Sequence, residues 1–252
     1  MQVINGTSLQ GQIVMGRLHF YHRPGYAIER FSKKPPEQEE QRYLWARQHS
    51  VLELAGVYDR VAEEVGKESA TIFAIHAMLL EDDDFDGQVR DMLYQEGVTA
   101  EYAVHTVGTQ IAAAFSAMKS EYMKARSVDI QDITRRMELR LLRAASPKRL
   151  TKQASIIVAE SFLPSEVMEL DRRRLLGLIS TKGSVNSHAA QLLRAYHIPT
   201  LGEIDMDPRW EGRLALMDGF AHRLYLDPDE EIQEQLRLNY QAGGKPEEAG
   251  AL

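Results

Sequence analysis

One histidine of the sequence lies where the surrounding backbone would favour phosphate chemistry. His188 follows a small polar loop, residues 183–187, and opens a segment with helical apolar spacing. The start of a helix offers N–H groups without intrahelical acceptors and the positive end of the helix dipole, so it favours a phosphate. A neutral imidazole there is a nucleophile, and the helix start would hold a phosphoryl group carried on it. The residues alone leave a second interpretation open, in which the loop only caps the helix and His188 is exposed.

The residues before His188 are small and polar, and they do not form a Walker A loop. That loop needs a glycine directly before its lysine, whereas here Lys182 precedes Gly183. Gly183 instead allows close backbone approach to a bound group. The residues expected to support a phosphate around His188 are Lys182, Gly183, Ser184, Asn186 and Ser187.

The other histidines give weaker signals. His19 and His22 lie three residues apart on an expected strand, so they point to opposite faces. His76 lies on the apolar face of an expected helix and is interpreted as a core residue. The sequence has no HExxH pattern and no cysteine, so we expect no metal site and no thiol nucleophile.

The apolar periodicity changes twice along the chain. Strand-type residues occupy 12–21, and helical spacing then runs from 37 to about 145. There we expect five antiparallel helices. The first buries the stripe of Leu44, Gln48, Val51, Ala55, Tyr58, Ala62 and Val65. The acidic run Asp82-Asp83-Asp84 caps the third helix, and the fourth is capped by Thr99 and buries Ala103, Val107, Ile111, Ala114 and Met118. The fifth opens at Ser127.

Beyond Pro147, short apolar strands alternate with helices. Strands are expected at 155–159, 175–180, 198–201, 213–217 and 223–226, with helices opening at 164 and 187. This alternation predicts an α/β fold, built from 1–21 and 147–228, with the helical bundle of 22–146 inserted and 229–252 as a linker or tail.

Composition excludes several classes of protein. Thirty Lys and Arg residues against 37 Asp and Glu give a net charge of −7, so no basic excess is available for binding nucleic acid. No apolar run approaches the length of a membrane span. We therefore expect a cytoplasmic protein of ordinary globular composition, without nucleic acid or membrane as a partner.

Several separated motifs resemble one known family, the N-terminal domain of Enzyme I of the bacterial phosphoenolpyruvate:sugar phosphotransferase system. Residues 177–202 resemble its phosphohistidine signature, with Ser187-His188, Arg194 and Ile198-Pro199 in place. The segments 72–82 and 121–133 resemble two runs of its helical domain, and Pro164-Ser165-Glu166 matches a third. The resemblance covers nearly the whole chain.

The resemblance implies a swivelling α/β domain that carries a phosphoryl group on His188 and exchanges it with HPr, a small phosphocarrier. It implies that the inserted helices bind HPr, through Met78, Leu79, Asp84, Phe85, Phe115, Met123 and Arg126. The phosphoenolpyruvate and Mg²⁺ of this family belong to a barrel domain, in cis or in trans, so no cofactor is expected in this chain.

Around the site the chain departs from the family pattern, and three of the departures bear on activity. Val185 replaces an arginine, Asn186 replaces a threonine, and Leu163 stands where the family has a threonine that hydrogen-bonds the imidazole. Three functions therefore stay open. They are the phosphohistidine module of a phosphoenolpyruvate-protein phosphotransferase, the related module of a dihydroxyacetone-kinase system, and a regulatory protein that docks HPr with weakened transfer.

Overall fold

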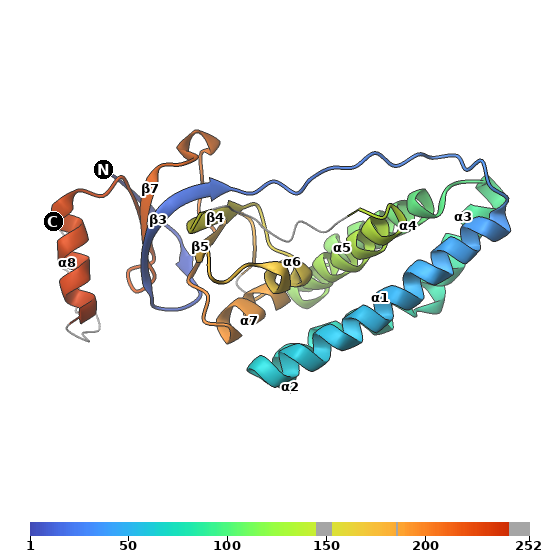
Figure 1. The fold of residues 1–252 in the computed structure, drawn as a ribbon, viewed down its shortest axis with the longest axis horizontal. Helices are drawn as coiled ribbons and strands as arrows, with labels where there is room; N and C mark the ends of the chain where they lie inside the picture. The colour runs from blue at the N-terminus through green and yellow to red at the C-terminus, as the bar shows by residue number, and fades with distance from the viewer. Residues whose placement is uncertain (145–152, 185, 242–252) are drawn as a thin grey trace. The chain divides into compact units, whose positions relative to one another are not determined.

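The computed structural model describes residues 1–144, 153–184 and 186–241, which form two compact units (Figure 1). The α/β unit comprises Met1–Arg23, Pro147–Phe162 and Glu166–Leu252. The helical unit comprises Pro24–Ser146 and Leu163–Ser165. The mixed α/β fold predicted from the sequence is confirmed. The short segment 163–165 groups with the helices, which periodicity along the chain did not indicate.

A single mixed sheet forms the centre of the α/β unit. In the described part of the chain its strand order is β1-β8-β7-β3-β4-β5-β6-β2, parallel from β3 to β6. The strands are β1 (Gln2–Asn5), β2 (Thr7–Ser8), β3 (Ile13–Phe20), β4 (Ser155–Ala159), β5 (Leu175–Ser180), β6 (Thr200–Gly202), β7 (Leu214–Asp218) and β8 (Arg223–Leu226). The further elements after β4 are α6 (Pro164–Glu169), α7 (His188–Ala195), the 3-10 helix η1 (Pro208–Trp210) and α8 (Glu230–Gln241).

The apolar sequence of β4 explains its place in the middle of the sheet. All five of its residues are buried, as expected for a parallel strand covered on both faces. Ile156 and Ile179 belong to a core that also contains Leu18, Leu201 and Met217. β4 and β5 run parallel, with Ala159 opposite Ser180, so the loops that follow them leave the same edge of the sheet. This pairing brings residues 160–162 beside the loop that precedes His188.

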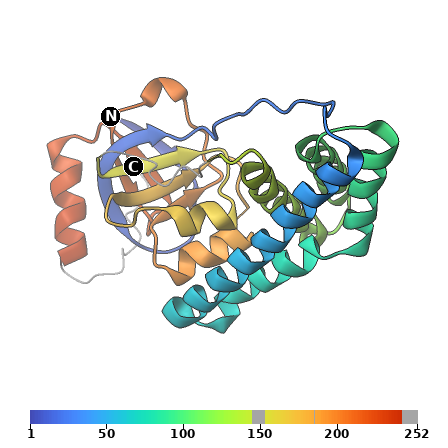
Figure 2. The same ribbon diagram turned by 45° about the vertical axis from the view of Figure 1, so that its right-hand side comes forward.

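Within its described residues, the helical unit contains five helices that run back and forth (Figure 2). They are α1 (Pro36–Val65), α2 (Lys67–Leu80), α3 (Asp83–Glu96), α4 (Ala100–Ser116) and α5 (Glu121–Leu141). Two predicted caps are confirmed. The Asp82 carboxylate accepts the amide of Phe85 at 3.1 Å, and the Thr99 hydroxyl accepts that of Tyr102 at 3.2 Å.

The predicted start of the fifth helix is wrong. α5 begins at Glu121, and Ser127 lies inside it. The Ser127 hydroxyl donates to the Lys124 carbonyl at 2.7 Å, so a side chain that often caps a helix is satisfied within one. Sequence spacing cannot separate these two uses of a serine.

The predicted apolar stripe of α1 is off by about one residue. The buried face is Glu39, Tyr43, Ala46, Ser50, Leu54, Val57 and Val61, whereas Gln48 and Ala55 of the predicted stripe are exposed. α1 packs against α2, α3, α4 and α5. Its buried face includes the polar residues Glu39 and Ser50, which a search for apolar spacing does not find. On α4 the predicted stripe fails at its end: Ala114 is exposed, and Met118, also exposed, lies after the helix, which ends at Ser116.

The predictions for the C-terminal region are partly wrong. Residues 230–241 form the helix α8 where a linker was expected, and 242–252 lie outside the described residues. The predicted strand 198–201 starts later, at Thr200. In the part of the chain that the structure covers, no helix is both long and apolar enough to cross a bilayer.

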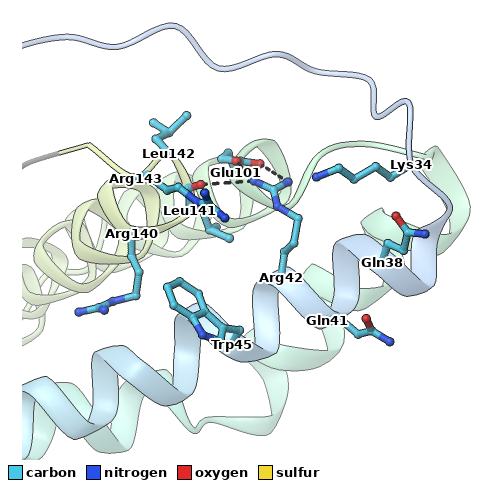
Figure 3. A pocket seen from close by; sticks show the side chains of 10 residues that line it. All are labelled: Lys34, Gln38, Gln41, Arg42, Trp45, Glu101, Arg140, Leu141, Leu142 and Arg143. Carbon is cyan, nitrogen blue, oxygen red and sulfur yellow. Dashed lines mark hydrogen bonds and ion pairs between the residues drawn. The ribbon is translucent and has the colours of Figure 1, made fainter.

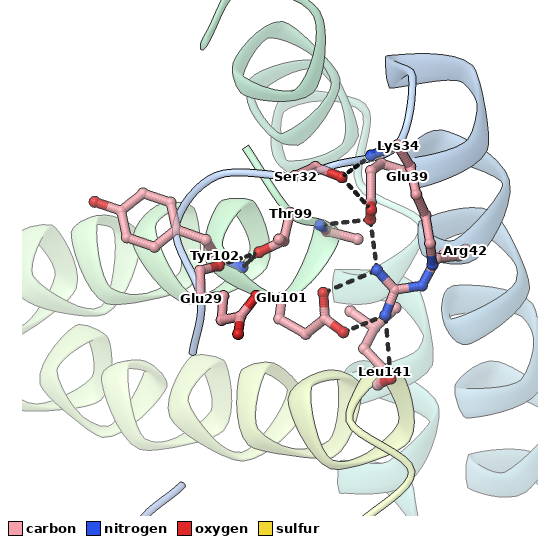
Figure 4. Close-up of polar contacts among 10 residues, drawn as sticks. Glu29, Ser32, Lys34, Glu39, Arg42, Thr99, Glu101, Tyr102 and Leu141 are labelled. Atoms are coloured by element: carbon pink, nitrogen blue, oxygen red, sulfur yellow. Dashed lines mark hydrogen bonds and ion pairs between the residues drawn. The ribbon is translucent and has the colours of Figure 1, made fainter. Parts of the chain in front are cut away.

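A buried ionic network links the start of α1 to α4 and α5 (Figure 4). The Arg42 guanidinium donates to Glu39 at 2.5 Å, to Glu101 on α4, and to the Leu141 carbonyl at 3.3 Å. Glu39, 2% exposed, also accepts the Ser32 hydroxyl at 2.6 Å and the Ala100 amide at 3.0 Å. Burial alone would raise the pKa of Glu39, but these hydrogen bonds and the Arg42 charge hold the pKa below its ordinary value.

We expect Glu39→Gln to lower the free energy of unfolding by about 1–3 kcal/mol at pH 7, because it weakens buried charged hydrogen bonds. A depressed carboxyl pKa adds stability that is present above its unfolded pKa, about 4.3, and is lost as pH falls through the folded value. The difference between Glu39→Gln and the parent should therefore shrink in acid. Urea unfolding at several pH values checks this, with Glu63→Gln, an exposed change on the same helix, as the control. A difference that stays constant down to pH values below about 3 would refute the assignment.

Candidate functional site

His188 is the first residue of α7, directly after the residue that caps the helix. The Ser187 hydroxyl accepts the Ala190 amide at 3.1 Å, and the Ser187 carbonyl accepts the Gln191 amide at 3.0 Å. Ser187 itself is extended, with φ −70° and ψ 158°, which turns the chain sharply into the helix. The imidazole is half-buried. It therefore extends from a fixed helix start, where N–H groups and the helix dipole favour an anion.

The loop before α7 is fastened to the loop after β4. The Lys182 amide donates to the Glu160 carbonyl at 2.8 Å. The Ser180 hydroxyl accepts the Gly183 amide at 2.8 Å and donates to that same Glu160 carbonyl at 3.2 Å. Sequence reasoning missed Ser180, although a hydroxyl at the end of an apolar strand could have indicated it.

The predicted phosphate-supporting residues differ in their surroundings. Gly183 and Ser187 lie within the hydrogen-bonded frame, while Ser184 and Asn186 are exposed. The Lys182 side chain, 74% exposed, pairs with the Glu160 carboxylate. A hydrogen bond from Lys182 holds the pKa of Glu160 below its ordinary value, so Glu160 partly neutralises this cation. Val185 lies outside the described residues.

A cleft of about 460 Å³ opens beside this loop. Lys182 and Thr181 line it together with Arg23, and the remaining lining residues are Phe20, Tyr21, His22, Val158, Ala159, Glu160, Ser161, Met206 and Pro208. Arg23 is held by Glu166 at 2.7 and 2.8 Å and by the Ser161 carbonyl at 2.7 Å. Arg23 is a further basic residue that the sequence did not single out, because it follows β3 and lies far from His188 along the chain.

Gly183 is required by its contacts. A Cβ at this position would lie 2.2 Å from the Ser180 hydroxyl oxygen. We expect Gly183→Ala to displace the loop. The phosphorylation that the sequence predicts at His188 should then slow by about tenfold or more, which corresponds to about 1.4 kcal/mol in the barrier. Quenched-flow labelling measures the rate. Ser180→Ala removes the clashing oxygen, so the double variant should recover part of the loss. A double variant as slow as Gly183→Ala would show that the clash is not the cause.

The helical residues predicted to bind a partner lie at two connections of the helical unit. Met78 and Asp84 flank the connection between α2 and α3, and both are exposed, Met78 at 71%. Phe115 and Met123 flank the connection between α4 and α5, with Met123 36% exposed and Phe115 half-buried. Leu79 is half-buried, and the Arg126 guanidinium lies 3.6 Å from Asp129.

Phe85 is the exception among these residues. Its side chain is 2% exposed, in the buried face of α3 with Val89 and Leu93. The interpretation of Phe85 as an exposed partner contact is wrong, because its side chain belongs to the core of the helical unit. Helical spacing alone could not decide whether Phe85 is exposed or buried, because Phe85 lies in the first turn of α3 and the spacing does not show which side of that turn packs against other helices.

His76 is buried, as expected, and lies against two carboxylates of α5. Its Nε2 is 3.3 Å from Asp129, and its Nδ1 is 3.8 Å from Asp132. Asp129 also pairs with Arg126, so this cluster joins the last turns of α2 to α5. Among the described residues, no group of three or more His, Asp or Glu side chains could hold a metal ion.

Comparison with known proteins matches both parts of the chain. The family model "PEP-utilising enzyme, N-terminal" covers residues 5–126, and "PEP-utilising enzyme, mobile domain" covers residues 151–221, which include His188. The chain belongs to the PEP-utilising enzymes.

Curated relatives carry a common name. The chain is 29% identical over 232 residues to the phosphoenolpyruvate-protein phosphotransferase of Priestia megaterium, covering 90% of this chain and 40% of that protein. It is 27% identical over 250 residues to that of Bacillus subtilis, covering 96% and 43%. The chain thus spans about two fifths of the length of these PEP-utilising enzymes.

Two solved structures share the fold over almost their whole length. The NMR solution structure of an Enzyme I protein (nEIt) aligns with a TM-score of 0.69 at 25% identity, covering 95% of this chain and 99% of that one. The N-terminal domain of "Enzyme 1 - Nitrogen" aligns with a TM-score of 0.60 at 27% identity, covering 94% and 99%. The resemblance to the N-terminal domain of Enzyme I is confirmed.

Proposed function

We propose that this chain is the phosphohistidine module of a phosphoenolpyruvate-protein phosphotransferase. His188 carries the phosphoryl group and exchanges it with HPr or an HPr-like carrier. The observation that carries this proposal is the position of His188, first in α7 and directly after the cap Ser187. The match of the mobile-domain family model to the same segment supports it.

Transfer to His188 needs little chemistry from the protein beyond placement and charge. An imidazole nitrogen attacks phosphorus, the bond from phosphorus to the donor nitrogen breaks, and the donor histidine leaves. The helix start stabilises the charge on the phosphoryl oxygens. Lys182 and Arg23 line the cleft beside the loop, where each pairs with a carboxylate, Glu160 and Glu166 respectively.

The partner surface belongs to the same proposal. Three of its residues are exposed near the α2–α3 and α4–α5 connections: the acidic Asp84 and the apolar Met78 and Met123. A carrier with a basic surface and an apolar centre suits them, because complementary charge orients a partner while buried apolar contacts hold it. Arg126 and Phe115 are its less exposed members.

The test is direct labelling of the purified chain by phosphorylated HPr. We expect about one phosphoryl group per chain, stable in base and labile in acid, as for a phosphoramidate. A chain that binds phosphorylated HPr without being labelled would instead be a docking protein. The departures from the family pattern at Asn186 and Leu163 favour this alternative. The remaining alternative is tested in parallel with the phosphorylated carrier of a dihydroxyacetone-kinase system. If that carrier labels the chain faster than phosphorylated HPr does, the chain is a module of the dihydroxyacetone-kinase type.

Phosphoenolpyruvate alone should not label this chain. Transfer from that donor needs a metal ion and a basic clamp on the donor, which the proposal assigns to a separate barrel domain. Incubation with labelled phosphoenolpyruvate and Mg²⁺ should leave the chain unlabelled, while adding the barrel domain of a relative should restore labelling. Stoichiometric labelling without a barrel would show that this chain holds the donor site itself.

A further inference from the structure

A second pocket lies in the helical unit, between the start of α1 and the end of α5 (Figure 3). Its volume is about 790 Å³, within the range of small-molecule sites. Four of its lining residues are cations and one is an acid, in a chain whose net charge is −7. The lining residues are Lys34, Gln38, Gln41, Arg42, Trp45, Glu101, Arg140, Leu141, Leu142 and Arg143.

Two of the four cations are already neutralised. Arg42 is held by Glu39 and Glu101, and Arg140 pairs with Glu53. These pairs build the wall of the pocket, and the bond from Arg42 to the Leu141 carbonyl also satisfies one acceptor at the end of α5 (Figure 4). The one acid in the lining, Glu101, is paired with Arg42, so its negative charge repels a bound anion less than an unpaired carboxylate would.

The other two cations have no acidic partner among the described residues. Lys34 and Arg143 are exposed and reach toward the middle of the pocket from opposite sides (Figure 3). The N-terminal end of α1, which starts at Pro36, adds its positive dipole on the same side as Lys34. Together these groups favour an anion with several oxygens, such as a phosphate.

An aromatic side chain lines the same pocket. Trp45 is 49% exposed, and its ring lies 4.4 Å from the His49 ring, which limits its freedom. A half-exposed tryptophan offers a face for a planar ring. Gln38 and Gln41 line the same pocket, and a glutamine amide can pair with the donor and acceptor of an adenine edge.

We propose that this pocket binds a nucleotide, with the base stacked on Trp45 and the phosphates between Lys34 and Arg143. The combination of a ring platform, amide groups and two unneutralised cations within one pocket carries the proposal. It is independent of the function proposed for His188. Phe115 and Met123, two of the proposed carrier contacts, lie at the opposite end of α4 and α5 from Glu101 and Leu141, and 17 residues of α4 span about 25 Å.

The two tryptophans of the chain allow a specific assay. Trp210→Phe in the full chain leaves Trp45 as the single tryptophan, so its fluorescence reports on this pocket. Titration with ADP should quench that fluorescence to saturation. Adenosine and inorganic pyrophosphate, which each supply half of the contacts, should bind about tenfold or more weakly than ADP. Thermal unfolding of every variant verifies the fold.

The controls are matched in charge. Arg143→Gln and Lys34→Gln should each weaken ADP by about tenfold or more, whereas Arg60→Gln, an exposed change near the other end of α1, should leave affinity unchanged. Labelling at His188 should be the same in all of them. The proposal is overturned by the absence of saturable quenching up to about 1 mM ADP, by adenosine binding as well as ADP, or by an Arg143→Gln affinity equal to that of the parent.

Discussion

His188→Ala should reduce labelling by phosphorylated HPr from about one phosphoryl group per chain to background. The substitution removes the only atom proposed to form the bond to phosphorus, and loss of a nucleophile costs at least about a thousandfold in rate. Since His188 is half-buried at a helix start, and alanine is the best helix former, the fold should be retained. Acid lability of the label, measured on both proteins, identifies the adduct.

The matched control for this experiment is His22→Ala. His22 is exposed and lines the cleft beside the loop, so it is the neighbouring imidazole most available to a donor. Its variant should be labelled like the parent. Label that persists in His188→Ala, or that disappears in His22→Ala, would move the acceptor away from α7.

Met78 and Phe85 should give opposite results when they are substituted. Met78→Asp should weaken carrier binding by about 2 kcal/mol, or roughly 30-fold, with little change in the melting temperature, because its side chain is 71% exposed. Phe85→Ala should instead lower the free energy of unfolding by about 3–5 kcal/mol, because it empties a buried site on α3. Calorimetric titration with the carrier and thermal unfolding measure both quantities on both variants.

Leu52→Asp is the control for Met78→Asp. Leu52 is 63% exposed on α1 and belongs to none of the proposed contacts, so the same change there should leave carrier affinity intact. Equal loss of affinity in both variants would show a general charge effect instead of a contact at Met78. A Phe85→Ala protein as stable as the parent would contradict its place in the core.

The sequence by itself determined the elements whose patterns are unambiguous. The apolar run 155–159 is typical of a covered strand, and the acidic run 82–84 and Thr99 precede helical spacing closely enough to supply caps. Ser187-His188 before an apolar helix likewise predicted the helix start. These signals are local, because a strand, a cap or a helix start depends on residues within a few positions.

Only the tertiary structure decided which side chains meet. The pairing of β4 with β5 brings Glu160 beside the loop that precedes His188, and Arg23 lines the cleft next to this loop. The burial of Phe85, the polar face of α1 and the basic pocket at Trp45 follow from helix packing, which adds partners that spacing along one helix cannot show. Burial and charge pairing depend on contacts between several segments of the chain. The periodicity of a single segment therefore could not predict them.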